Sequence, residues 1–295
     1  MRAHRLLISY HYFRSKPLGR LLVERYATKP RIFADSGAFS ALTQGAVISI
    51  EEYAEWLTRF EHLFAVYANL DVIGDAEATL RNQRWLEARG FKPLPVYHMG
   101  EPWEFLDAML DRYPYIGLGG LVGTGVGKSD LNAFASECFN RAAQRGSKAV
   151  FHGLGLTSVR ALTALPWFSC DSSSWGSGSM FGCLSLFNPE RGQLEKVQIS
   201  DPDDVLRHET LIRHYGYEPA QFLDKRLYSW RYATEIAARS WREFESFMRK
   251  VHGPVPHPSG TDLPGPHIYL AATCDQLHHV ANRSIAKHEP LREVS

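Results

Sequence analysis

Short apolar segments alternate with helical segments throughout the first 171 residues, and this alternation constrains the fold more than any other feature. The apolar segments span residues 5–12, 31–35, 64–71, 92–98, 115–121, 148–152 and 167–170. Helices are predicted between them from apolar residues at helical spacing, with Ser49 and Asp75 as N-caps and Gly90 and Gly146 as helix ends. Strict alternation is typical of a parallel sheet, and seven β-then-α units favour a closed (β/α)8 TIM barrel over an open sheet.

The alternation stops after Asp171. Residues 172–179 are small and polar and predict a mobile loop, and residues 194–199 could form either the eighth strand or an added hairpin. A helical insertion is predicted at about 203–252, followed by an extended loop at 253–266 that contains five prolines. Residues 268–272 and a helix at 275–285 complete the fold. We expect a single barrel domain over residues 1–295 with a C-terminal helical appendage.

Composition limits the partners and the compartment. The net charge is +1 at pH 7, so any surface for nucleic acid must be local. The four cysteines lie far apart without a CxxC pair, which favours reduced thiols in a cytosol-like compartment. The apolar run at residues 6–8 is too short for a signal peptide or a membrane span. We therefore expect a soluble, cytoplasmic protein with no membrane partner.

The predicted strand ends carry residues of chemical interest. In a (β/α)8 barrel these ends meet at one face, where active sites lie. Here they carry three carboxylates, three histidines and two glycine-rich turns: His11, Asp35, Asp71, His98, Gly119-Gly120, His152, Gly153-Leu154-Gly155 and Asp171. Asp35, followed by Ser36-Gly37, fits an Asx-turn that bonds its own backbone, and it equally fits an acid or base presented to a cleft. We expect a catalytic or binding cleft at this face.

Two chemistries fit these residues. Metal-dependent hydrolysis would use the histidines and aspartates as ligands, although His11 stands alone where barrel hydrolases commonly have a His-x-His pair. Glycosyl transfer would use Asp35 and Asp171 as a pair of carboxylates around an oxocarbenium-like transition state.

Five short motifs resemble those of the tRNA-guanine transglycosylases, in the same order along the chain. Residues 33–39 (FADSGAF) resemble their Asp-Ser-Gly-Gly-Phe motif, and Leu70-Asp71 is similar to their base-reading aspartate. Residues 116–121 (IGLGGL) resemble their Gly-Gly-Leu strand, and residues 152–155 (HGLG) resemble their Met-Gly-x-Gly turn. Ser169-Cys170-Asp171 lies where the family keeps its nucleophile. The matches cover about half of the chain.

The chain departs from the tRNA enzymes in three respects. Residues 97–100 (YHMG) stand where those enzymes usually have Gln-Gly-Gly, their Cys-x-Cys-x-x-Cys…His zinc site is absent, and the chain is shorter. Cys274 with His278 and His279 is too sparse to replace that zinc site. The chain most resembles the compact, zinc-free DNA 7-deazaguanine transglycosylases (the DpdA family) of phages and bacterial modification systems. A phage enzyme of this kind would act in the host cytoplasm, and no metal or other cofactor is expected.

The resemblance implies an enzyme that exchanges guanine in DNA for a 7-deazapurine through a covalent glycosyl-enzyme intermediate. Asp171 would be the nucleophile and Asp35 the proton shuttle. Asp71 would accept hydrogen bonds from the N1-H and 2-amino group of the base. The other implied base-binding residues are Ser36, His98, Gly119, Gly120 and His152.

Some of these residues also have structural interpretations. His11 and His152 could serve only as hydrogen-bonding residues of the barrel mouth. Cys170 is expected to be a small packed residue and not a nucleophile.

Basic and aromatic residues alternate between positions 225 and 250, which predicts a nucleic-acid surface. Its candidate contacts are Arg226, Arg231, Arg239 and Arg242. The same pattern fits an amphipathic helix with Trp230 and Trp241 buried. Residues 172–179 and 253–266 are predicted to hold the displaced strand. Alternative functions are a tRNA-guanine transglycosylase and, less favoured, a metal-dependent hydrolase or a non-catalytic subunit that positions nucleic acid. The sequence leaves open whether the protein is a homodimer.

Overall fold

Eight parallel strands form one curled sheet in the computed structural model, which describes residues 5–19, 30–121, 127–224, 226–257, 260 and 263–272. The strand order is β3-β2-β1-β10-β7-β6-β5-β4. The strands are β1 (Arg5–Ser9), β2 (Arg31–Asp35), β3 (Phe64–Tyr67), β4 (Val96–His98), β5 (Tyr115–Gly119), β6 (Val150–Gly153), β7 (Ser169–Ser172) and β10 (His267–Ala272).

The two outer strands meet just beyond their regular pairing. Ala68 and Leu94 form a parallel bridge, in which the Leu94 amide donates to the Tyr67 carbonyl at 2.7 Å and the Asn69 amide donates to the Leu94 carbonyl at 2.9 Å. This bridge closes the sheet between β3 and β4. The predicted (β/α)8 barrel is therefore confirmed.

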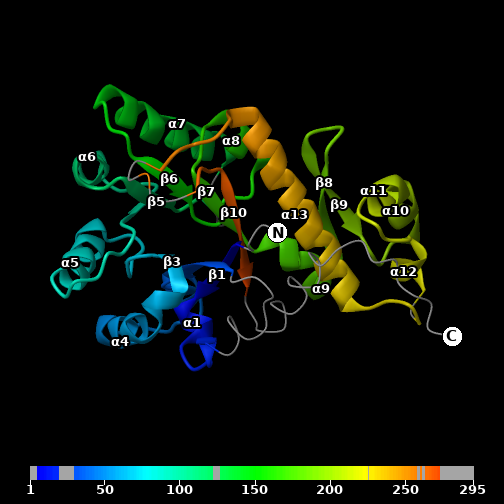
Figure 1. The fold of residues 1–295 in the computed structure, drawn as a ribbon, viewed down its shortest axis with the longest axis horizontal. Coiled ribbons are helices and arrows are strands. Elements are labelled where there is room, and N and C mark those ends of the chain that lie inside the picture. The colour runs from blue at the N-terminus through cyan, green and yellow to red at the C-terminus, as the bar shows by residue number, and fades with distance from the viewer. Residues whose placement is uncertain are drawn as a thin grey trace.

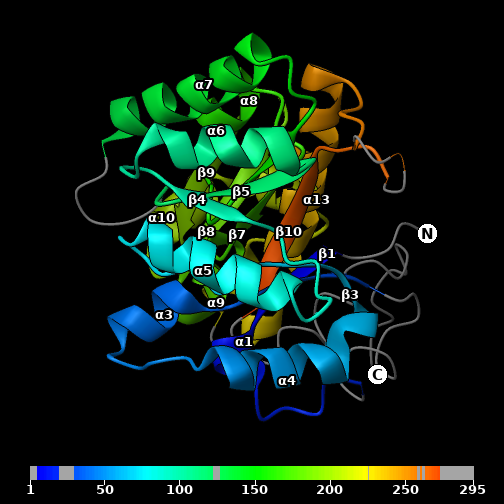
Figure 2. The ribbon, with the colours of Figure 1, turned by 90° about the vertical axis from the view of Figure 1, so that its left-hand side faces the viewer.

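Helices cover the outside of the sheet, and Figure 2 shows α4, α5, α6 and α7 following one another around it. The helices up to β7 are α1 (Tyr10–Phe13), α3 (Ala38–Thr43), α4 (Ile50–Phe60), η1 (Glu61–Leu63), α5 (Ala76–Glu87), α6 (Trp103–Arg112), α7 (Lys128–Gln144) and α8 (Val159–Ala164). Both predicted caps are confirmed. Ser49 Oγ accepts from the Glu51 and Glu52 amides, and Asp75 Oδ1 accepts from the Ala78 amide.

The eighth barrel strand is β10, and residues 193–198 belong to an added antiparallel hairpin. The hairpin is part of an insertion that follows β7. Its elements are η2 (Ser174–Gly176), α9 (Ser177–Phe181), β8 (Cys183–Asn188), β9 (Gln193–Gln198), α10 (Pro202–Arg207), α11 (Glu209–His214) and α12 (Ala220–Leu223).

The long helix α13 (Trp230–His252) lies between the barrel and the insertion (Figure 1). Its residues Ala237, Trp241 and Phe244 belong to the barrel core. Ala233 and Ile236 instead join the apolar cluster of the insertion. Because one helix contributes to both clusters, the insertion is packed against the barrel and not merely tethered to it.

Residues 5–12 and 172–179 differ from their predicted structures. The strand predicted at residues 5–12 ends at Ser9, so His11 lies in the helix α1. Residues 172–179, predicted as a mobile loop, form the end of β7, η2 and the start of α9. Trp175 within this segment is 1% exposed, and its Nε1 donates to the Ala271 carbonyl at 2.9 Å. A buried, hydrogen-bonded indole fixes this connection.

Residues 253–257 and 263–266 of the proline-rich segment lie on the opposite face from the carboxyl ends of the strands. The segment follows α13 and leads into β10, and the ring of His257 packs edge-on against Tyr115, the first residue of β5, at 5.5 Å. Gly265 touches the start of β7, because a Cβ there would lie 2.2 Å from the Phe168 carbonyl oxygen. The described part of this segment covers the barrel floor. The prediction that it holds a displaced strand at the active-site face is therefore wrong.

Some predicted features cannot be compared with the structure. The helix expected at 275–285, together with Cys274, His278 and His279, lies outside the described residues. Within the described ranges, no helix combines the length and the apolar character that crossing a membrane requires.

Candidate active site

Three carboxylates meet at the carboxyl ends of β2, β3 and β7, as the sequence predicts. Asp35 is the last residue of β2, Asp71 follows β3, and Asp171 lies in β7. Burial, together with the negative charges of Asp71 and Asp171, raises the pKa of Asp35 to about 7. Near neutral pH, Asp35 can therefore both give and take a proton, which an ordinary aspartate cannot do efficiently.

A tight turn fixes the Asp35 carboxylate. The Gly37 amide donates to Asp35 Oδ2 at 2.9 Å, which is the predicted Asx-turn. Gly37 has a φ of 79°, and a Cβ there would lie 2.2 Å from Ser9 Oγ and 2.6 Å from the Cβ of His11. Only glycine fits this close approach of β2 to β1. The turn and the raised pKa occur at the same carboxylate, so the two interpretations of Asp35 are compatible.

Asp71 is held by two residues that the sequence assigns to the base site. Ser36 Oγ donates to Asp71 Oδ1 at 3.0 Å, and His98 Nε2 lies 3.0 Å from Asp71 Oδ2. On its other side, His98 Nδ1 lies 3.3 Å from Glu101 Oε1, while the His98 amide donates to Glu101 Oε2 at 2.9 Å. His98 thus lies between two carboxylates.

The charge on His98 follows from this arrangement. Burial favours the neutral ring, but the hydrogen bonds and charges of Asp71 and Glu101 outweigh it and raise the pKa of His98 to about 9. A charged imidazole donates from both ring nitrogens. Both nitrogens of His98 are therefore engaged in holding Asp71 and Glu101.

Glu101 is a site residue that the sequence analysis missed. Its signal is the spacing of three residues from His98, across the turn that follows β4. The neighbouring strand leaves room for the histidine ring, because a Cβ on Gly119 would lie 2.3 Å from Cδ2 of His98. Gly119 is buried, whereas Gly120, directly after β5, is exposed at the mouth.

Asp171 has an asymmetric set of partners. Its Oδ1 accepts a hydrogen bond from the Gly155 amide at 2.8 Å and lies 3.2 Å from His152 Nε2. From the described residues, no hydrogen bond reaches Oδ2. Asp171 is 7% exposed, and one of its oxygens is anchored from within the barrel while the other accepts no hydrogen bond from the described residues.

His152 lies beneath Asp171 with no exposed surface. Its Nδ1 is 2.6 Å from Ser169 Oγ, and its ring stacks on Phe33 with centroids 4.3 Å apart. This arrangement corresponds to the hydrogen-bonding interpretation of His152. His11 has a similar role at the surface, where its Nε2 lies 3.0 Å from Gln44 Oε1.

The arginines predicted to bind nucleic acid have different surroundings. Arg239 donates to the Tyr215 carbonyl at 2.9 Å and lies 5.1 Å from the Tyr217 ring centroid, so it holds the insertion to α13. Arg226 is exposed and pairs with Asp224 at 3.0 Å. Arg231 and Arg242 are exposed and half-buried, respectively.

The aromatic residues of α13 favour the structural interpretation for its core-facing side. Trp241 is 1% exposed, and Trp230 is partly buried. The first turn of α13 lies on the side of the carboxyl strand ends, because α13 runs back from β7 to the start of β10. Arg231 lies in this first turn, where it is exposed and 5.9 Å from the ring centroid of Trp230.

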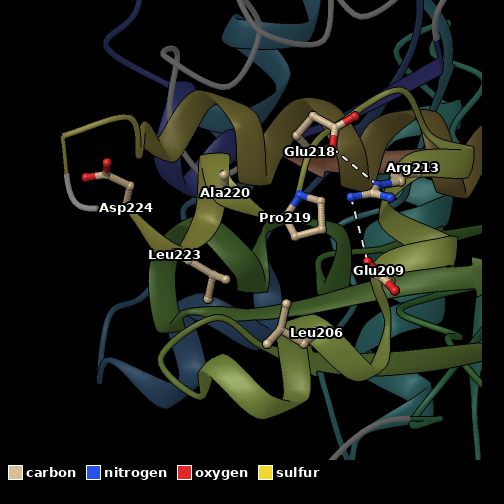
Figure 3. Close-up of a pocket in the computed structure, with 8 residues that line it drawn as sticks. All are labelled: Leu206, Glu209, Arg213, Glu218, Pro219, Ala220, Leu223 and Asp224. Carbon is tan, nitrogen blue, oxygen red and sulfur yellow. Dashed lines mark hydrogen bonds and ion pairs between the residues drawn. The ribbon is translucent and has the colours of Figure 1, made fainter.

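A separate pocket lies in the insertion (Figure 3). Its volume is about 470 Å³, and Arg213 in its wall pairs with Glu218 at 3.2 Å and Glu209 at 3.7 Å. The pocket contains none of the predicted site residues. Its lining consists of Leu206, Glu209, Arg213, Glu218, Pro219, Ala220, Leu223 and Asp224.

Two further kinds of side chain could carry chemistry, the cysteine thiols and the residues able to bind a metal. Burial raises the pKa of the Cys170 thiol well above its usual range, in keeping with a packed residue. Across the ranges that the structure covers, no cluster of three or more His, Cys, Asp or Glu side chains could hold a metal ion.

Comparisons with known proteins identify no relative: no family model matches the chain, and no curated protein or solved structure matches it.

Proposed function

We propose that the protein is a DNA-guanine transglycosylase that replaces guanine in DNA with a 7-deazapurine. The proposal rests on the meeting of Asp35, Asp71 and Asp171 at one barrel face, each with a different set of partners. One carboxylate can exchange a proton, one has an oxygen free to bond carbon, and one is clamped by a cation. Base exchange at a nucleoside requires a group that carries a proton and a nucleophile that bonds C1′, and a fixed carboxylate can select the base.

In the first step, Oδ2 of Asp171 attacks C1′ of the nucleoside as the bond from C1′ to N9 breaks. The departing guanine receives its proton from Asp35, whose raised pKa keeps the carboxyl partly protonated at neutral pH. The product is a glycosyl ester on Asp171 and free guanine. Asp35 is then a carboxylate, ready to act as a base.

In the second step, a 7-deazapurine occupies the place of guanine. Asp35 takes the N9 proton as N9 attacks C1′, and the ester bond to Asp171 breaks. Both carboxylates return to their starting states, so the cycle needs no oxidant, metal or nucleotide cofactor. The exchange is reversible in principle, and the supply of 7-deazapurine sets its direction.

Base selection is assigned to Asp71. A carboxylate can accept two hydrogen bonds from the N1-H and 2-amino group of guanine, an edge that adenine lacks. Ser36 and His98 support this role by orienting Asp71 from two sides. Gly120, which is exposed, follows β5 at the mouth, where a base would enter.

Exposed apolar residues around the strand ends support a polymer substrate. Phe39 and Leu42 on α3, Val47 after it, and Phe181 on α9 are 52%, 59%, 90% and 75% exposed. Enzymes that extrude a base from a duplex often fill the vacated stack with apolar side chains. Arg231 at the start of α13 could contact a phosphate nearby. An enzyme with this activity would act in the cytoplasm that holds its DNA, as a monomer or a homodimer.

The test is an incubation of the protein with radiolabelled guanine and either duplex DNA or a guanine-bearing tRNA at matched salt. We expect label in DNA, displaced by unlabelled 7-deazapurine, and a covalent DNA adduct that Asp171→Ala lacks. Incorporation into tRNA alone would change the substrate to tRNA. If label enters neither polymer, although the DNA and the tRNA are both folded and in excess, base exchange is rejected.

A further inference from the structure

We infer that His152 is a positioning residue, held by Ser169 and Tyr115 in the tautomer that donates from Nε2 to Asp171, so that Oδ2 of Asp171 is the reactive oxygen. The identity of the reaction at Oδ2 rests on the proposed function. The hydrogen-bond chain that orients Asp171 does not, and it can be measured separately.

The chain of hydrogen bonds crosses three adjacent strands. In the sheet, His152 of β6 is in register with Gly117 of β5 on one side and with Ser169 of β7 on the other. Tyr115 Oη lies 2.5 Å from Ser169 Oγ, which lies 2.6 Å from His152 Nδ1. His152 Nε2 then lies 3.2 Å from Asp171 Oδ1. The chain runs from the floor of the barrel to the carboxylate at its mouth.

Only one direction of donation satisfies every member of this chain. Asp171 Oδ1 is an acceptor, so the facing Nε2 of His152 must carry hydrogen. In a neutral ring Nδ1 is then an acceptor, and the Ser169 hydroxyl donates to it. Ser169 Oγ in turn accepts from Tyr115, because the single hydrogen of the Ser169 hydroxyl is already donated to Nδ1. The opposite tautomer would place a lone pair of Nε2 against the carboxylate.

Burial makes the chain rigid. His152 is 0% and Ser169 is 1% exposed, so bulk water does not compete for their hydrogen bonds. Phe33 stacks on the imidazole with an interplanar angle of 23°, and Tyr269 packs against it edge-on. The ring plane is thus fixed by packing, while Asp171 sets the tautomer and Ser169 donates to Nδ1 in that tautomer.

The consequence for Asp171 is a division between its two oxygens. His152 and the Gly155 amide both act on Oδ1, from the protein side. The carboxylate cannot rotate without breaking both contacts. Oδ2 therefore keeps its lone pairs and a fixed direction, and a bond to carbon forms there without rearrangement of the site.

The first measurement is the tautomer of His152 by ¹⁵N NMR of histidine-labelled protein at pH 7, without DNA. We expect hydrogen on Nε2 in the natural protein and in both Ser169 variants, because Asp171 is unchanged. The ¹⁵N signal of Nδ1 should shift in Ser169→Ala, which removes its donor, and return in Ser169→Thr, which keeps the hydroxyl. Ser246→Ala, at an exposed hydroxyl of α13, is the matched control and should not alter His152. Hydrogen on Nδ1 in the natural protein would overturn the inference.

The second measurement is single-turnover formation of the covalent DNA adduct. Ser169→Ala should slow this step about 10- to 100-fold with little change in the affinity for DNA. Ser169→Thr should recover most of the rate, and thermal unfolding should show each variant folded. An unchanged rate in a Ser169→Ala protein whose Nδ1 signal has shifted would reject the role of His152. Absence of any adduct in the natural protein, with the tautomer pattern as expected, would reject the proposed function while supporting the positioning of Asp171.

Discussion

His98 Nε2 lies 3.0 Å from Asp71 Oδ2, and neither side chain is more than 10% exposed. An ion pair this deeply buried is strongly coupled to folding, since the same groups in the unfolded chain are solvated separately. The pair therefore connects the proposed selection of the base with the stability of the barrel.

The first prediction concerns stability at high pH. The pKa of His98 is raised from 6.5 to about 9 on folding, so its contribution is complete below pH 6.5 and is lost as the pH rises through 9. The loss corresponds to at most about 3 kcal/mol. Urea unfolding between pH 6 and pH 10 should show a steeper decline for the natural protein than for His98→Gln. Parallel declines would contradict a charged His98.

The second prediction is that Asp35→Asn stabilises the protein while inactivating it. The folded pKa of about 7 exceeds the ordinary 3.8, so ionisation of Asp35 destabilises the fold increasingly as the pH rises from 3.8 through 7. An amide avoids this cost. Asp35→Asn should be about 2 kcal/mol more stable at pH 8, allowing for partial exposure, and about equally stable at pH 3.

Exchange by Asp35→Asn should fall about 10²- to 10⁴-fold, since an amide cannot carry the proton. Unfolding curves at the two pH values and steady-state exchange rates together test this prediction. Equal stability at pH 8 would mean that the charges of Asp71 and Asp171 do not act on Asp35.

The third prediction is that Asp71→Asn weakens the binding of guanine and also lowers stability, because it leaves the buried His98 without one of its two charged partners. The amide offers one acceptor and places a donor against the donors of the base. Losing one charged hydrogen bond should reduce affinity about 10- to 150-fold, measured by calorimetry with free guanine. Asp75→Asn is the matched control, because Asp75 caps α5 from the surface. Undiminished guanine affinity in Asp71→Asn would move the reading role to His98.

The fourth prediction separates two arginines of α13. Arg239→Ala should cost about 1–2 kcal/mol of stability, because it removes contacts with Tyr215 and Tyr217. Arg231→Ala should change stability by less than about 0.5 kcal/mol but weaken DNA binding and lower the salt slope by about one. Urea unfolding and DNA binding at several salt concentrations distinguish them. Unchanged DNA binding in Arg231→Ala would locate the nucleic-acid surface elsewhere.

The convergence of Asp35, Asp71 and Asp171 could be predicted from the sequence, because alternation implies parallel strands and parallel strands share one carboxyl face. Glu101 could not, since it becomes a site residue only through the turn that brings it back to His98. The role of His152 could not be predicted either, because it depends on contacts between strands in the folded protein. Its partners Tyr115 and Ser169 lie on the two neighbouring strands, and no local pattern connects them.

The remaining differences between the predicted and the observed fold arise from which segment forms the eighth barrel strand. Residues 193–198 and 267–272 both have strand-like sequences, and only their pairing distinguishes a hairpin from the eighth strand. Once β10 is known to be that strand, the segment before it must lie at the amino ends. The proline-rich segment was therefore misplaced for a topological reason.

The bridge between Ala68 and Leu94 has a consequence for how the proposed base preference could diversify. Asp35 and Asp171 lie on strands paired on both sides, so their positions are tied to the whole sheet. Asp71 instead follows the isolated bridge that closes the barrel between β3 and β4, and it is oriented by the side chains of Ser36 and His98. Substitutions around this bridge could retune which base is accepted while leaving the two reacting carboxylates undisturbed. In the proposed mechanism, a new base preference could therefore evolve without moving the strands that carry Asp35 and Asp171.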